Sequence, residues 1–314
     1  MTKNNLKNYI SIIFLTVIFA IGTSIPLGII SAISSVILVG LIGYAVTRFH
    51  YTLVGLVCIC TFVPYAIFGA DIISALYAYS EVILCALALG ICFNLKLSGI
   101  KTISIVSGFH IVYTLLTMMI TGVGKDFVTS LNDTMQSLYP LYEGHISQED
   151  FRSVMMITVD MITRFVPSIV VLSGFFAGII YFGAFRLILK ITKSESFYER
   201  FSDCRADKSL SVMYFVITFI NFLLPAENYY SDIVANVVLI TTFVFFVFGL
   251  ALIAHKLNTR FGNSPKKKLL FTLAVISPLF LLGLPFTVIG YIGALDGIFD
   301  FRHKNTQKNT ISKD

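Results

Sequence analysis

Residues 75–90, ALYAYSEVILCALALG, decide the class of fold, because they are almost entirely apolar and yet contain the carboxylate of Glu81. With its flanks, the stretch is long enough to cross the hydrocarbon core of a bilayer, which takes about 20 residues of helix. A charged side chain at the centre of such a helix costs roughly 3 kcal/mol or more. The stretch therefore predicts a membrane-spanning helix whose acidic residue has a partner.

The rest of the chain repeats this apolar pattern. Of its 314 residues, 56% are hydrophobic and only 13% are charged, and the mean hydropathy is +0.85. A soluble domain typically carries about twice that charged fraction. Apolar runs near the length of a membrane-spanning helix cover residues 9–24, 26–47, 52–68, 72–93, 102–121, 160–190, 209–224, 233–255 and 269–299. We therefore expect an all-α polytopic transmembrane helix bundle with eight or nine spans.

The first and last runs differ from the others. Lys3 and Lys7 precede the first run, but no small-residue cleavage site followed by soluble sequence comes after it. We therefore expect a retained span rather than a signal peptide. The last run contains Pro278 and Pro285, which remove helical hydrogen bonds and bend the axis. It forms either one long kinked helix or two short ones.

Small residues recur four positions apart, a spacing that lets two membrane helices approach closely. The pairs are Gly28/Ala32, Ala66/Ala70, Ala86/Gly90, Gly174/Gly178 and Gly293/Gly297. They predict a compact bundle but indicate no chemistry.

The spans divide the chain into four segments. These are residues 1–121 with the first five transmembrane helices, 122–159 as an extracytoplasmic loop, 160–299 with the remaining transmembrane helices, and 300–314 as a basic polar tail.

The loop has helical signals of its own. Phe127, Leu131, Met135 and Leu138 fall at helical spacing, which predicts a short amphipathic helix. The stretch SQED at 147–150 is typical of an N-cap followed by acidic residues in the first helical turn. The next helix is therefore expected to start before the membrane, and the loop is either a lid or a docked spacer.

Lysine and arginine residues indicate the orientation. With the N-terminus in the cytoplasm, the connections before the last run place 16 Lys and Arg inside, and only Lys125, Arg152 and Arg164 fall outside; the other four lie in the tail. This asymmetry predicts a cytoplasmic N-terminus. Because the basic residues border the apolar runs, the net charge of +6 is explained by orientation, and no nucleic-acid partner is expected.

Signatures of catalysis are missing from the sequence. The stretch GVGKD at 122–126 lacks the spacing and the terminal Ser or Thr of a phosphate-binding loop. The five cysteines form no CxxC or Cys/His ligand pattern. We expect neither an enzyme nor a metal or other cofactor. Without an ATP-binding domain, any energy for transport would come from a partner protein or a gradient.

Polar stripes on two neighbouring spans form the first candidate site. On the fourth span the stripe contains Tyr77, Glu81 and Cys85, and on the fifth it contains His110 and Thr114. Glu81 and His110 each lie about halfway along their helix, so two antiparallel helices with a short connection would place them at similar depth. The pair either binds a proton or a polar ligand, or ties the two spans together, which is worth only about 0.6 kcal/mol per polar contact.

A second polar cluster is predicted near the outer surface. Asp160 and Arg164 lie four residues apart on the sixth span, Asn221 lies near the end of the seventh, and Asp232 and Asn236 open the eighth. If this region is concave, Arg164 is the natural anchor for an anionic group. The alternative is an i,i+4 ion pair at the interface, which contributes about 0.2–0.5 kcal/mol.

Three stretches in the second half carry a family resemblance: FSDCRADKSL at 201–210, FGLALI at 248–253 and LDGIFDFR at 295–302. In this order they resemble the YybS-like family of bacterial membrane proteins, a family named for a domain of unknown function. The family usually has Trp and Pro at the positions of Cys204 and Asp207, and Gln at the position of Phe248. The resemblance implies a multi-pass protein of the bacterial plasma membrane. It also implies a fold related to the substrate-binding subunits of energy-coupling-factor vitamin transporters, which dock on a separate ATPase module.

Two functions fit these observations. The first is binding or transport of a small polar molecule, with Glu81 and His110 at the floor of the site and Arg164 at its mouth. The second is a non-transporting membrane scaffold, whose basic cytoplasmic loops at 192–208 and 256–268 recruit envelope or signalling proteins. An intramembrane enzyme is disfavoured by the missing metal and nucleophile patterns. The partners expected are the lipid bilayer, a small polar ligand, and a separate energising or cytoplasmic protein.

Overall fold

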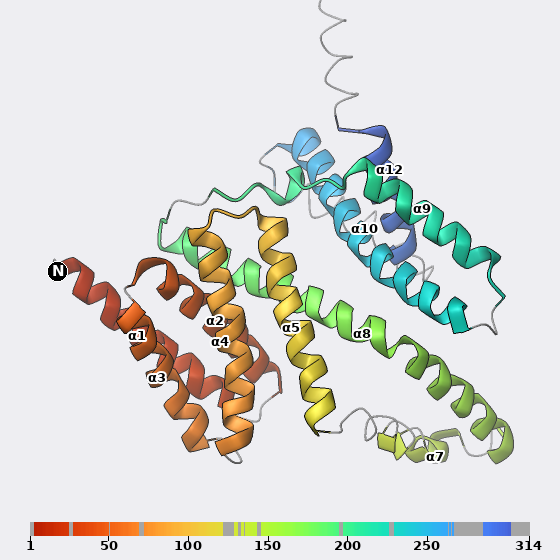
Figure 1. Ribbon diagram of the computed structural model, residues 1–314, viewed down its shortest axis with the longest axis horizontal. Helices are drawn as coiled ribbons and strands as arrows, with labels where there is room; N and C mark the ends of the chain where they lie inside the picture. Colours follow the sequence, from red (N-terminus) through yellow and green to blue (C-terminus); the bar gives the residue numbers. More distant parts are fainter. Residues whose placement is uncertain are drawn as a thin grey trace, which may run out of the picture. The chain divides into compact units, whose positions relative to one another are not determined.

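A computed structural model of the protein describes residues 3–24, 28–49, 51–68, 72–121, 129–130, 133–134, 136–142, 146–194, 197–225, 229–262, 264, 266 and 285–302. These residues form helices and connections, and no strand occurs among them. The helices are α1 Lys3–Ser24, α2 Gly28–Arg48, α3 Tyr51–Phe68, α4 Ile72–Asn94, α5 Gly99–Thr121, α7 Tyr139–Tyr142, α8 Gln148–Ile191, the 3-10 helix η1 Phe201–Asp203, α9 Lys208–Leu223, α10 Tyr229–Phe261 and α12 Pro285–Phe299 (Figure 1). The expected all-α fold is confirmed.

Four of these helices, α2, α5, α8 and α10, are long and apolar enough to cross a membrane. Five more helices, α1, α3, α4, α9 and α12, contain apolar stretches of 10–17 residues in their described parts. They bring the total in the described part of the chain to nine, in agreement with the expected eight or nine spans. In the last apolar run, residues 269–284 lie outside the described residues. Its second half is described as α12, Pro285–Phe299.

The start of α8 agrees with the predicted N-cap. The Asp150 N–H donates to the Ser147 hydroxyl oxygen at 3.1 Å, and that hydroxyl donates to the Asp150 carboxylate at 2.6 Å. The helix continues for 44 residues. Of the predicted amphipathic helix before it, Phe127, Leu131 and Met135 lie outside the described residues, and α7 is the helix described there.

The chain forms two compact units. The first comprises Met1–Asp126 and Ser173–Tyr198, and the second comprises Phe127–Leu172 and Glu199–Asp314, so α8 contributes to both.

In the first unit, α2 packs against α1, α3 and α4 around fully buried Leu38, Ile42 and Leu89. Helices in this unit approach each other closely at glycines of the predicted small-residue pairs. A Cβ at Gly90 would collide with Val46 of α2, and a Cβ at Gly178 of α8 would collide with Ser107 of α5.

In the second unit, α10 packs against both α12 and α9 (Figure 1). Tyr214 and Phe245 are the large buried side chains there. A Cβ at Gly293 would collide with the Phe245 carbonyl, and a Cβ at Gly249 would collide with the Ile289 carbonyl. The α10 and α12 backbones are therefore in direct contact, which only glycine permits at these positions.

Candidate functional site

Glu81 and His110 are brought together in the first unit. The Glu81 Oε1 and His110 Nδ1 atoms are 2.7 Å apart, and the side chains are 24% and 17% exposed. No hydrogen bond of good geometry reaches Nδ1 from the described residues, so the contact is a close approach of the imidazole and the carboxyl group rather than an aligned N–H···O bond. The sequence prediction that α4 and α5 set these residues at one depth therefore agrees with the structure.

The surroundings of this pair come from three helices. The Tyr181 ring of α8 lies edge-on to the His110 ring, with centroids 6.5 Å apart. Thr114 lies one helical turn from His110 on α5 and is half-buried. Tyr77 belongs to α4, but its side chain lies outside the described residues. The arrangement joins α4, α5 and α8 through polar and aromatic groups, which is compatible with either of the roles considered for the pair.

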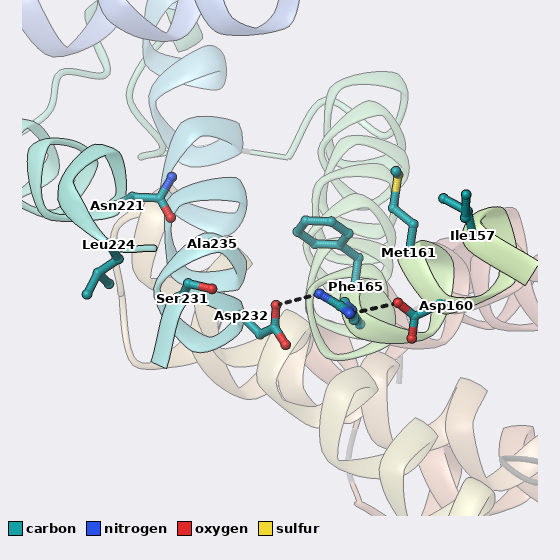
Figure 2. A pocket seen from close by; sticks show the side chains of 10 residues that line it. Ile157, Asp160, Met161, Phe165, Asn221, Leu224, Ser231, Asp232 and Ala235 are labelled. Carbon is teal, nitrogen blue, oxygen red and sulfur yellow. Dashed lines mark ion pairs between the residues drawn. The ribbon is translucent and has the colours of Figure 1, made fainter. Parts of the chain in front are cut away.

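The second predicted cluster lies in the second unit and lines a cavity. The cavity has a volume of about 470 Å³. Apolar Ile157, Met161, Phe165 and Leu224 share its wall with Asp160, Arg164, Asn221, Ser231, Asp232 and Ala235 (Figure 2). Its lining residues come from the interior of α8, the C-terminal end of α9 and the first two turns of α10.

Arg164 is held between two carboxylates at this wall. Its guanidinium lies 2.8 Å from Asp160 and 3.6 Å from Asp232, the ion pairs marked in Figure 2. The i,i+4 pair on α8 is therefore present, and α10 adds a second acid. Together the three side chains carry a formal charge of −1, so the two carboxylates compete with any anionic group for the Arg164 guanidinium.

The backbone beneath Arg164 has a feature that the sequence analysis missed. Pro167 interrupts α8 and supplies no N–H. The Ser168 N–H donates to Asn236 Oδ1 at 3.1 Å, and Asn236 Nδ2 donates to the Arg164 carbonyl at 2.9 Å. In a regular helix, the Ser168 N–H and the Arg164 carbonyl would bond to each other.

Asn236 thus joins α10 to α8 at the proline. Its Nδ2 also donates to the Asp232 carbonyl at 2.8 Å, and the buried Ser168 hydroxyl donates to the Asn236 carbonyl at 3.1 Å. We refer to this arrangement of Asn236, Ser168 and the Arg164 carbonyl as the Asn236 clamp. It fixes the backbone that carries Arg164, and hence one wall of the cavity. The sequence analysis placed Asn236 in the predicted cluster with Arg164, but it did not predict the contact with Ser168 or the part played by Pro167.

A buried charge pair was also missed. The Arg302 guanidinium donates to the Asp296 carboxylate at 2.8 Å and to the carbonyls of Ser202 and Cys204 at 2.6 and 2.8 Å. The Arg302 and Asp296 side chains are 6% and 2% exposed. Ser202 and Cys204 belong to the first of the stretches that carry the family resemblance, and Asp296 and Arg302 belong to the third. That resemblance was the signal by which the sequence could have pointed to the pair. A buried pair with its hydrogen bonds satisfied is a structural element rather than a binding group.

These observations define an integral membrane protein of the multi-pass helical class. The sequence model of the family described as "Predicted membrane protein (DUF2232)" matches residues 13–296, and the chain belongs to this family. No curated protein and no solved structure matches the chain.

Proposed function

We propose that this protein binds a small polar molecule in the cavity around Arg164 and serves its transport across the bacterial plasma membrane. The observation that supports this most is the Asp160–Arg164–Asp232 network at the wall of a cavity of about 470 Å³. Ligand sites are typically cavities of roughly 300–1,000 Å³ with mainly apolar walls and a few placed polar groups. The proposal is one of binding, not of catalysis.

The net charge of the Asp160–Arg164–Asp232 network determines which class of ligand the cavity would favour. With two carboxylates and one guanidinium, the wall favours a molecule that carries an amino group, either as a cation or as a zwitterion. Its amine would lie against Asp160 or Asp232, and an acidic group, where present, would take the carboxylate's place on Arg164.

The membrane orientation and the energy source in this proposal are inferred from the sequence. The distribution of Lys and Arg favours a cytoplasmic N-terminus, which puts the Arg164 cavity on the outer side of the membrane. The YybS-like resemblance favours a substrate-binding subunit that works with a separate energising protein, as in energy-coupling-factor transporters.

The alternative function, a membrane scaffold, has one observation in its favour. Arg302 holds the loop that contains Ser202 and Cys204 in a fixed conformation. Beside it lies a polar cavity of about 360 Å³, lined in part by Arg200, Asp203 and His255. A shaped, polar surface in a basic cytoplasmic loop would suit a protein partner.

Untargeted mass spectrometry of co-purifying small molecules tests the proposal. We would compare the wild type with Arg164→Gln and with Arg205→Gln. Arg205 pairs with Asp300 at 2.9 Å in the same unit, so its variant removes the same charge and an ion pair without touching the cavity. A polar amine retained by the wild type and by Arg205→Gln, but lost from Arg164→Gln, is the expected result.

Two other results would count against the proposal. If nothing is enriched over a detergent blank, binding is refuted for molecules that survive purification, and proximity labelling of loops 192–208 and 256–268 would test the scaffold. If a species is lost only from a Glu81→Ala, His110→Ala double variant, the site is the Glu81–His110 pair in the first unit and not the cavity.

A further inference from the structure

An apolar groove in the first unit has no role in the proposed function. It has a volume of about 330 Å³ and lies between the second half of α4 and the first half of α5, with no polar surface in its lining. Its walls include Leu84, Ala88, Ile91 and Cys92 of α4, and Ile105 and Phe109 of α5. Several of these side chains are exposed, including Ile91 at 50% and Phe109 at 45%. In a membrane, such a groove faces acyl chains.

The turn after α4 closes one end of the groove. The Leu97 N–H donates to the Cys92 carbonyl at 3.0 Å, and the Lys96 N–H donates to the Phe93 carbonyl at 2.9 Å. This is the Schellman arrangement that ends many helices, with its left-handed residue at Lys96, whose φ is 54°. Because Leu95 and Leu97 both line the groove, the backbone of Lys96 lies at its end.

A second lysine lies at the same end. Lys101 precedes Ile105 by four residues and Phe109 by eight, so the three share one stripe of α5. Both lysines are exposed. The first turn of α5 contains no acidic residue, and none occurs between Glu81 and Asp126. Among the described residues, no ion pair involves Lys96 or Lys101.

We propose that an anionic phospholipid binds here, with an acyl chain in the α4–α5 groove and its phosphate at Lys96 and Lys101. The groove accounts for the chain and the two uncompensated cations account for the headgroup. Basic residues at the cytoplasmic end of membrane helices attract anionic lipid with a free energy that corresponds to about a fivefold gain in affinity per residue. This inference does not depend on the Arg164 cavity.

Native mass spectrometry of the delipidated full-length protein tests the inference. The probes are dioleoyl phosphatidylglycerol and dioleoyl phosphatidylcholine, which have the same chains and differ in headgroup charge. For the wild type we expect tighter binding of phosphatidylglycerol. For the Lys96→Gln, Lys101→Gln double variant we expect phosphatidylglycerol affinity to fall by about tenfold or more while phosphatidylcholine affinity is unchanged.

Two control variants make the test specific. Lys190→Gln, Lys193→Gln removes the same charge at the end of α8, where Lys193 also lies in a left-handed turn with φ 50°, and is expected to keep the wild-type preference. Ile91→Trp narrows the groove from an exposed wall and is expected to reduce binding of both lipids. Equal affinity of the wild type for the two lipids would overturn the proposal, as would an equal effect of the two lysine pairs. If Ile91→Trp instead dissociates a dimer, the groove is an interface between copies and the proposal is wrong.

Discussion

Replacing Asn236 by leucine, a side chain of similar volume without hydrogen-bonding groups, is expected to destabilise the second unit by breaking the Asn236 clamp. The change removes the partners of the Ser168 N–H and the Arg164 carbonyl. Interhelical polar contacts in membrane proteins average only about 0.6 kcal/mol, because the separated groups usually find other partners. Here the Pro167 ring opposes closure of the regular helical turn, so the buried Ser168 N–H stays unpaired, whereas the carbonyl of exposed Arg164 can accept from water.

An unpaired buried backbone group such as the Ser168 N–H costs about 1–3 kcal/mol, and loss of the contact between α8 and α10 adds about 1 kcal/mol. The expected loss in free energy of unfolding for Asn236→Leu is therefore about 2–4 kcal/mol. In a Pro167→Ala background, the turn can close and the Ser168 N–H can donate to the Arg164 carbonyl directly. The cost of Asn236→Leu should then fall to about 1 kcal/mol. A coupling energy of roughly 1–3 kcal/mol between the two positions is therefore the central expectation.

Denaturant titration in detergent, followed by circular dichroism of the helices, would measure this cycle and give the free energies. Asn221→Leu makes the same chemical change on α9 away from the proline and serves as the control. If Asn236→Leu costs the same in the wild type as in the Pro167→Ala background, the clamp does not compensate for the proline, and the reasoning fails.

Three further predictions concern other parts of the chain. Arg302→Met leaves the buried carboxylate of Asp296 unpaired and should cost about 3–5 kcal/mol by the same assay, whereas a joint Arg302→Met, Asp296→Leu change should cost clearly less. Lys96→Gly should stabilise the protein by about 1 kcal/mol, because glycine adopts the left-handed turn without strain; an unchanged melting temperature would contradict this. Burial raises the pKa of Tyr198 above its usual value, although nearby Thr102 opposes the rise. Since the unfolded chain releases this proton first, the tyrosine should lower stability progressively above pH 10, and Tyr198→Phe should flatten the pH dependence of unfolding in that range.

The helices and the Glu81–His110 pair were predictable because both depend on local spacing. The run at 102–121 became α5 Gly99–Thr121, and the run at 72–93 became α4 Ile72–Asn94. Because only a short connection joins these two helices, the depth of Glu81 and of His110 in the membrane could be predicted from the position of each residue along its apolar run. The close approach at Gly178 was likewise visible as a small-residue pair.

The Asn236 clamp and the Arg302 pair were not predictable, because each depends on which distant segments meet. Asn236 lies 68 residues from Ser168, and Arg302 lies 100 residues from Ser202. The spacing of residues within one apolar run does not indicate which other run packs against it. Similarly, the cluster around Arg164 was expected, but the second carboxylate on its guanidinium, which changes the charge of the site, came from the packing of α10 on α8.

The left-handed lysines, Lys96 and Lys193, have a consequence for biosynthesis. Each ends a helix in a conformation that glycine would adopt with less strain, and each is also one of the basic residues whose distribution predicts the orientation of the chain. If that predicted orientation is correct, glycine at these turns would favour the finished fold while removing a charge that acts earlier, as the helices enter the bilayer. A variant optimised for melting temperature at both positions is therefore expected to yield less correctly inserted protein per cell, even though each inserted molecule is more stable.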